Sequence, residues 1–353
     1  MDSSGTRGRA RDPHRAAARV LAVAAGAVLA ACAAPAPDAQ PLPALGVDAQ
    51  RVVLVGLSSG AAFATQAHLA HPERFVGVGL VAGPPYGCAG GDLQVALGSC
   101  MKGEPAPDAE ALVADIRARA ADGRIGPLEG LAGDRVWVLR GSADPVVGEA
   151  VVDATVAVYR ALAEDAPGLE VRYDGGRAFG HLLPTDGDAG VACGETASPF
   201  LGACGFDAAG AALDALLGPA PGAPPAQAQG ELLAFDQDAL RPGGADAFLA
   251  DTGYVYVPAQ CRERDCGVVV ALHGCDQNAG AVGEAFVRDA GFNRQADARD
   301  LVVLYPQTRA SYAPLNPKAC WDWWGYSGTD YDTRDGVQLR WLSAALDALA
   351  RPR

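Results

Sequence analysis

The stretch RVVLVGLSSGAAFA, residues 51–64, carries the strongest structural signal in the sequence. It reads as a buried β-strand that runs into G-L-S-S-G (residues 56–60) and then into small residues. A strand, a G-x-S-x-G turn and a closely packed helix form a nucleophile elbow, which exposes the central serine at the end of a sheet. Ser58 is therefore the candidate nucleophile. A chance match or a plain strand-to-helix turn is the alternative.

Strand and helix patterns alternate after this turn and predict a mostly parallel sheet with helices on both faces. The expected strands are 51–55, 75–81, 135–140 and 169–173, and the expected helices are 61–70, 109–121 and 147–163. A Pro/Ala/Gly-rich linker follows at about 217–230. Beyond it we expect an edge strand or part of a hairpin within 248–261, strands at 268–272 and within 300–307, a helical stretch at 282–298 and an amphipathic helix at 335–350.

Neither part of the chain makes a complete sheet alone, because the first begins on the elbow strand and the second ends on a helix. Placing the second part in front gives strand, His-Gly loop, helix, strand, helix, strand and nucleophile elbow, which is the order of an α/β-hydrolase. The sequence therefore predicts a circularly permuted α/β-hydrolase. Residues 46–353 would form a single domain, and the linker at about 217–230 would join the former termini.

The N-terminus has the pattern of an export signal. Five arginines within residues 7–19 precede an apolar run at 20–31, which is too short to span a bilayer comfortably. The run ends in L-A-A-C, so residues 1–31 are predicted to be a signal peptide and Cys32 a lipid-modified cysteine, with residues 32–45 as a tether. An ordinary cleaved signal with an incidental Cys32 is the alternative. Both interpretations export the protein, to a lipid-anchored position in the cell envelope or to the extracellular space.

Eight of the nine cysteines follow Cys32, an even number that suits disulfides in an oxidising compartment. Nearest-neighbour pairing is the expectation, although the sequence alone does not choose a connectivity. The expected pairs are 88–100, 193–204, 261–266 and 275–320. No metal site is predicted, because the chain has no C-x-x-C motif and no ligand-spaced histidine cluster. The net charge of −14 argues against a nucleic-acid partner.

A serine hydroxyl becomes a nucleophile when a histidine takes its proton and a carboxylate orients that histidine. Asp144 follows a buried strand in GSADPVV and is the candidate acid, although a turn or helix-cap role would give the same pattern. His68 and His71 look like surface residues of the helix after the elbow. His181, in GHLLPTD after the next strand, remains as the candidate base, and the order Ser, Asp, His is that of α/β-hydrolases.

Two further segments complete the candidate site. The oxyanion of an acyl-transfer intermediate needs N–H donors, and the backbone N–H groups of Ser59 and of Cys275 in LHGCDQN are the candidates. A tight turn is the alternative for the His-Gly pair. The segment NPKACWDWWGY, residues 316–326, is loop-like and rich in tryptophan, so Trp321 and Trp324 are candidates for a substrate-binding wall. Burial in the core is the alternative for this cluster.

These motifs together resemble the poly(3-hydroxybutyrate) depolymerases and related polyester esterases, especially the circularly permuted, single-domain type. The resemblance rests on GLSSG, GSADPVV, GHLLPTD, LHGCDQN and CWDWWGY, spread over residues 51 to about 341. It implies a serine esterase that hydrolyses poly(3-hydroxybutyrate) or its oligomers through an acyl-enzyme and needs no cofactor. It also implies Ser58 as nucleophile, Asp144 as acid and His181 as base.

Two other functions stay open at this point. Feruloyl and acetyl-xylan esterases share the His-Gly loop and the aromatic loop, so a plant-derived ester is an alternative substrate. A non-catalytic surface lipoprotein that kept the fold for binding is an alternative of another class. A polyester or oligoester is the expected partner. A membrane would be contacted only through a lipid anchor at Cys32.

Overall fold

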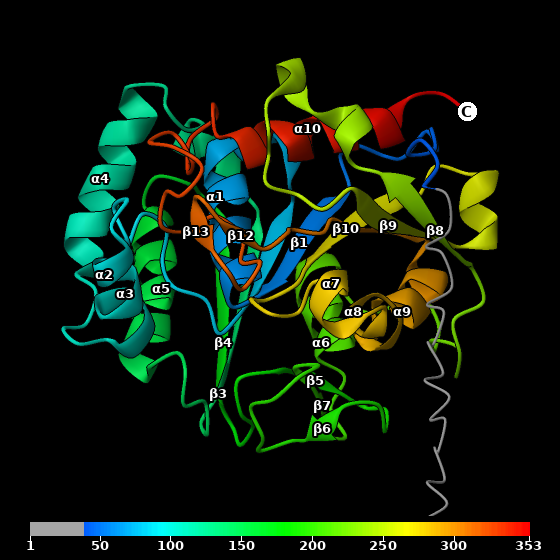
Figure 1. Ribbon diagram of the computed structural model, residues 1–353, viewed down its shortest axis with the longest axis horizontal. Helices are drawn as coiled ribbons and strands as arrows, with labels where there is room; N and C mark the ends of the chain where they lie inside the picture. The colour runs from blue at the N-terminus through cyan, green and yellow to red at the C-terminus, as the bar shows by residue number, and fades with distance from the viewer. Residues whose placement is uncertain (1–38) are drawn as a thin grey trace, which may run out of the picture. The chain divides into compact units, whose positions relative to one another are not determined.

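The computed structural model describes residues 39–353, so the predicted signal segment 1–31, Cys32 and the first part of the predicted tether lie outside the described residues. Within residues 39–353 the main sheet has eight strands in the order β4-β3-β2-β1-β10-β11-β9-β8 (Figure 1). The strands from β4 to β11 in this order are parallel, whereas β9 and β8 are antiparallel to their neighbours. The strands are β1 (Val52–Leu57), β2 (Gly77–Val81), β3 (Arg135–Gly141), β4 (Glu170–Arg177), β8 (Glu231–Asp236), β9 (Thr252–Val257), β10 (Gly267–Leu272) and β11 (Leu301–Tyr305).

Strand β1 joins the two parts of the chain into one sheet. Val53 pairs with Gly77 of β2 on one side and with Val269 of β10 on the other. Strands that precede the linker therefore lie on one side of β1, and strands that follow it lie on the other. Residues 218–230 connect helix α6 (Ala208–Leu217) to β8. Because α6 packs on the sheet to which β8 belongs, the linker does not separate two sheets.

Helices cover both faces of the sheet, as the alternating pattern predicts (Figure 1). Helices α1 (Ser59–Ala70), α5 (Glu149–Leu162) and α10 (Val337–Ala350) pack on one face, with α4 (Ala109–Ala121) outside α5, while α6 and α9 (Phe292–Arg299) pack on the other. Every residue of β1, β10 and β11 is buried. A parallel strand covered on both faces is apolar along its whole length, which explains the uninterrupted runs VVLVGL, GVVVAL and LVVLY.

Several short elements depart from the sequence prediction. The single helix expected at 282–298 is three helices, α7 (Ala279–Val282), α8 (Ala285–Asp289) and α9. Gly283 and Gly291, with φ of 62° and 91°, interrupt it because a right-handed helix cannot contain such residues. The prediction also missed α2 (Leu93–Leu97), α3 (Ser99–Lys102), the hairpin β12 (Ser311–Tyr312) with β13 (Leu315–Asn316), and a small sheet of β5 (Leu183–Thr185), β6 (Val191–Ala192) and β7 (Leu201–Ala203).

The nearest-neighbour disulfide prediction is confirmed. The bonds are Cys88–Cys100, Cys193–Cys204, Cys261–Cys266 and Cys275–Cys320. Four disulfides indicate a chain that folds in an oxidising compartment outside the cytoplasm. In the described part of the chain, no helix combines the length and the apolar character that crossing a membrane would require.

Candidate active site

The candidate site lies at the carboxyl ends of the parallel strands, where open α/β sheets bind their ligands. Ser58 follows β1, the segment 273–278 follows β10, Asp144 follows β3 and His181 follows β4. The aromatic segment follows β11. The topology of the sheet thus brings together segments that the sequence separates by more than half its length.

Ser58 occupies a strained turn between β1 and α1. Its φ of 56° lies in the left-handed region, which is costly for a residue with a side chain. The Ser58 N–H donates to the carbonyl of Val81 on β2 at 2.8 Å, and the Ser58 carbonyl accepts from the N–H of Ala62 at 3.0 Å. These two bonds hold the strained conformation from both sides, so the serine is fixed by main-chain contacts.

Both glycines of the motif are required by close contacts. A Cβ added to Gly56 would lie 2.3 Å from the carbonyl carbon of Gly60. A Cβ added to Gly60 would lie 2.4 Å from the carbonyl oxygen of Leu272 at the end of β10. The helix after the serine can therefore start this close to the sheet only without side chains at these positions. The turn is a nucleophile elbow in its geometry as well as in its sequence.

Asp144 and His181 form a buried pair. The His181 Nδ1–H donates to Asp144 Oδ2 at 2.8 Å, and the Asp144 side chain is inaccessible to solvent. The other oxygen, Oδ1, accepts from the N–H of Val146 at 2.7 Å and of Val147 at 3.0 Å. Asp144 therefore contacts the turn with one oxygen and the histidine with the other. This arrangement leaves Nε2 of His181 free to accept a proton.

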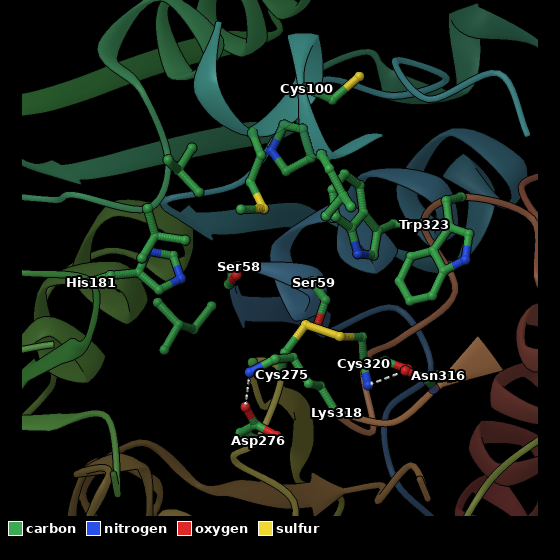
Figure 2. A pocket seen from close by; sticks show the side chains of 18 of the residues that line it. Ser58, Ser59, Cys100, His181, Cys275, Asp276, Asn316, Lys318, Cys320 and Trp323 are labelled. Carbon is green, nitrogen blue, oxygen red and sulfur yellow. Dashed lines mark hydrogen bonds and ion pairs between the residues drawn. A yellow bond between two sulfur atoms is a disulfide. The ribbon is translucent and has the colours of Figure 1, made fainter. Parts of the chain in front are cut away.

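The His181 ring reaches the same cavity as Ser58. Figure 2 shows a nitrogen edge of the ring directed toward Ser58 across the cavity. The backbone N–H of His181 donates to Thr196 Oγ1 at 2.8 Å, which fixes the loop that carries the ring. Within residues 39–353 no direct hydrogen bond links the Ser58 hydroxyl to His181, a looser spacing that is common for a nucleophile and its base before substrate binds.

The backbone N–H groups of Ser59 and Cys275 form no hydrogen bond with any group of the described residues 39–353. Both residues line the cavity. Since the carbonyl and the N–H of a trans peptide point in opposite directions, the orientation of the Gly274 carbonyl sets that of the Cys275 N–H. The His273 Nδ1–H donates to this carbonyl at 2.7 Å, and His273 Nε2 accepts from the Thr308 N–H at 3.2 Å.

Two further contacts hold the 273–278 loop. Gln277 Oε1 accepts from the Gly274 N–H at 2.8 Å, and Gln277 Nε2 donates to the carbonyls of Pro199 and Phe200 at 3.0 Å. The disulfide Cys275–Cys320 joins the loop to the start of the aromatic segment. Sequence reasoning did not single out Gln277 or Thr196. Their roles depend on contacts between loops that are distant in the sequence.

The cavity has a volume of about 510 Å³ and is mainly apolar. Its walls include Leu93, Leu97, Met101, Val146, Trp323 and Trp324. Trp324 lines the cavity. Trp321 does not, so its prediction as a wall residue is wrong: it is fully buried and stacks on Phe63 of α1 with ring centroids 4.5 Å apart. Trp323 takes its place (Figure 2).

The expectation that His68 is a surface residue is wrong. Its ring is completely buried, with Nε2 3.0 Å from Asp134 Oδ2 and Nδ1 3.1 Å from the Tyr159 hydroxyl. Helix α1 is buried along its whole length, so even its polar residues face other elements. Among residues 39–353 no group of three His, Cys, Asp or Glu side chains is placed to hold a metal ion.

Known proteins with similar sequences identify the family of this chain. No protein-family model matches the chain. A poly(3-hydroxybutyrate) depolymerase of Delftia acidovorans is 36% identical over 94% of this chain, which spans 66% of that enzyme's length. A polyhydroxybutyrate depolymerase of Talaromyces funiculosus is 32% identical over 84% of this chain and 89% of its own. The chain belongs to the poly(3-hydroxybutyrate) depolymerase family.

Solved structures of this depolymerase family support the same assignment. The crystal structure of a depolymerase from Penicillium funiculosum matches with a TM-score of 0.80 and 30% identity, over 88% of this chain and 99% of that one. A serine-to-alanine depolymerase variant in complex with a trimer of R3HB, (R)-3-hydroxybutyrate, matches with a TM-score of 0.79 and 29% identity over the same shares. The fold is thus of the α/β-hydrolase type found in this family, and its relatives are carboxylic ester hydrolases.

Burial of His273 predicts a pH dependence of stability. Desolvation lowers the pKa of its ring from 6.5 to about 4. Between these values the unfolded chain binds a proton that the folded protein does not, so stability falls as the pH is lowered through this window. We expect His273 to remove up to about 3 kcal/mol from the free energy of unfolding between about pH 7 and pH 4.

Urea denaturation at several pH values measures this effect, with His273→Asn as the comparison. The buried carboxyls Asp322 and Asp332, whose pKa values burial raises, act in the opposite direction, but they are common to both proteins. The variant should therefore lose the His273 part of the slope. Equal slopes in the two proteins would contradict the prediction.

Proposed function

We propose that this chain is a serine esterase that hydrolyses the ester bonds of poly(3-hydroxybutyrate) or its oligomers through an acyl-enzyme. The observation that carries the proposal is the convergence of Ser58 and the His181–Asp144 pair on one apolar cavity. The relatives named as depolymerases of this polyester supply the substrate class. The exposed side chains of Leu97 and Leu315 at the cavity suit a polymer surface.

The proposed mechanism uses only groups of this chain. His181 Nε2 takes the proton of Ser58 as its oxygen attacks the ester carbonyl, and Asp144 holds the ring through Nδ1–H. The N–H groups of Ser59 and Cys275 donate to the oxyanion of the tetrahedral intermediate. The intermediate then collapses: the bond between the carbonyl carbon and the leaving ester oxygen breaks, and His181 gives its proton to that oxygen, which departs as the hydroxyl end of the shortened chain. Water repeats the sequence on the acyl-enzyme and releases the acid.

Apolar walls favour this substrate over a sugar-linked ester. Each unit of the polyester carries a methyl group and no hydroxyl, so it gains from contact with Leu, Met, Val and Trp side chains. The R3HB trimer bound by a structural relative is a ligand of this class. We assign Trp323 and Trp324 to the wall that contacts the acyl chain.

Ser58→Ala is the first test of this proposal. Loss of the nucleophile should lower kcat by roughly 10⁴-fold or more, because the remaining groups of such a site do not form a covalent intermediate. The measurement is clearing of an amorphous poly(3-hydroxybutyrate) suspension together with release of 3-hydroxybutyrate. Ser142→Ala, which removes an exposed hydroxyl, is the matched control and should keep wild-type rates.

The outcomes separate the alternative functions. Full activity of Ser58→Ala would refute the nucleophile assignment. Hydrolysis of aryl or acetyl esters without polymer clearing would move the substrate to plant-derived esters of the feruloyl or acetyl-xylan type. Failure of an organophosphate probe to label Ser58, with no hydrolysis of any ester, would leave a non-catalytic binding protein.

We also propose that Cys32 is lipid-modified after removal of residues 1–31. The support is the sequence pattern at 7–32, together with the disulfides that indicate export. Wild-type protein expressed with labelled fatty acid should incorporate the label and sediment with membranes, whereas Cys32→Ser should be unlabelled and released. An unlabelled wild type would show that residues 1–31 form an ordinary cleaved signal.

We further propose that the chain order is a circular permutation. Two observations support it: strands that follow the linker continue the sheet beside β1, and residues 45–46 lie beside residues 349–351. The N–H groups of Leu45 and Gly46 donate to the carbonyls of Leu349 and Arg351 at 3.0 and 2.9 Å. A flexible connection could therefore join these ends.

A chain reopened within 218–230, with residue 353 joined to residue 39 by a short Gly/Ser linker, should fold and keep esterase activity. Circular dichroism and hydrolysis of p-nitrophenyl butyrate measure this, with the same reordered chain carrying Ser58→Ala as the blank. A reordered chain that stays unfolded would contradict the proposal.

A further inference from the structure

Asp322 is a buried carboxylate without a cationic partner. It lies in the aromatic loop, defined as residues 321–327, and the residue is only 1% exposed. Among the described residues no Lys, Arg or His side chain forms an ion pair with it. Burial raises the pKa of its carboxyl. A carboxylate in such a place is costly unless hydrogen bonds compensate its lost hydration.

Backbone N–H groups of the same loop supply this compensation. Asp322 Oδ1 accepts from Trp324 at 3.3 Å, Gly325 at 2.7 Å and Tyr326 at 3.0 Å, and Oδ2 accepts from Ser327 at 2.7 Å. The main chain therefore wraps around one carboxylate, in the way that Asp side chains organise turns and helix starts. Gly325, with φ of 87°, provides the left-handed residue that this path requires.

The main chain of Asp322 is fixed to two helices of the core. Its N–H donates to Gln338 Oε1 of α10 at 3.0 Å, and its carbonyl accepts from Gln66 Nε2 of α1 at 3.0 Å. Helix α1 is the helix that starts next to Ser58. The position of Asp322 is thus fixed relative to the turn that carries Ser58.

Trp323 and Trp324 have no comparable polar anchor of their own. Their rings meet edge to face at 5.7 Å, and the Trp324 ring packs on Tyr326 at 5.0 Å. The Trp323 Nε1–H is buried without a partner among the described residues. The positions of both rings in the cavity wall therefore follow from the path of the main chain between residues 322 and 327.

We propose that Asp322 is a positioning residue that sets the aromatic wall of the cavity and so determines how tightly the site holds an acyl chain beyond the scissile ester. Asp322 does not line the cavity and acts through Trp323 and Trp324. The proposal rests on the proposed esterase function and adds to it a determinant of chain-length selectivity.

The test is Asp322→Asn, which keeps the shape of the side chain but places an amide N–H against a backbone N–H. We expect the KM for a methyl-capped trimer of (R)-3-hydroxybutyrate to rise about tenfold, equivalent to about 1.4 kcal/mol of binding. The kcat for the trimer and the hydrolysis of p-nitrophenyl acetate should stay within about threefold of wild type. Asp330→Asn, an exposed aspartate of the following turn, is the matched control and should change neither.

A double-mutant cycle tests the route of the effect. If Asp322 acts through the tryptophans, Asp322→Asn should raise KM no further in a protein that already carries Trp323→Ala and Trp324→Ala. An unchanged trimer KM in the single variant overturns the proposal. An additive rise in the cycle, or a folded variant that loses p-nitrophenyl acetate hydrolysis, overturns it as well.

Two provisions keep the test decisive. If Asp322→Asn does not fold, Gly325→Ala replaces it. A side chain is strained at the φ of 87° of this position, so the substitution displaces the N–H donors that surround the carboxylate. The same rise in KM supports the proposal, and an unchanged KM overturns it. If the wild-type protein does not hydrolyse the trimer, the proposed substrate is wrong, and this result does not bear on Asp322. The ratio of KM values for p-nitrophenyl hexanoate and acetate then decides the role of Asp322.

Discussion

The close approach of helix α1 to the end of strand β10 is the constraint on which the site depends. The first turn of the helix lies against the carbonyls of Leu272 and His273, and only glycine at position 60 leaves room for this contact. Ser58, just before this turn, has a left-handed conformation held by hydrogen bonds to Val81 and Ala62, and Ser59 and Cys275 line the same cavity. A strained residue persists only where the surrounding structure fixes it, and here two strands and a helix do so.

The loops around this contact are held by polar side chains that bridge neighbouring segments. Gln277 links the loop after β10 to residues 199–200, Thr196 holds the loop of His181, and Asp322 organises the aromatic loop. Functional residues are often found on loops because a rigid sheet positions those loops. The shape of each loop here depends on a few polar side chains whose hydrogen-bonding groups have partners. The positions of the candidate reacting groups therefore depend on residues that do not themselves take part in the proposed reaction.

The sequence revealed those features that follow from local pattern. Continuous apolar runs identify β1, β10 and β11, and positions at strand ends pointed to Asp144 and His181, which the structure joins at 2.8 Å. Features that depend on tertiary packing could not be predicted from the sequence. His68 looked exposed because α1 has no apolar stripe, yet the sheet and other helices cover every side of that helix. Which tryptophan of CWDWWGY faces the cavity depends on the hydrogen bonds of Asp322, which no periodicity displays.

The disulfide between Cys275 and Cys320 has a consequence for how such a site can diverge. It joins the 273–278 loop covalently to the segment that starts the aromatic wall, so a displacement of one is transmitted to the other. A substitution that reshapes the wall to admit a bulkier acyl chain also pulls on the loop beside Ser58. Leu93, Leu97 and Met101 line the same cavity from helices α2 and α3, which no disulfide joins to the 273–278 loop. Substitutions there should therefore change the preferred acyl chain with less effect on the loop beside Ser58.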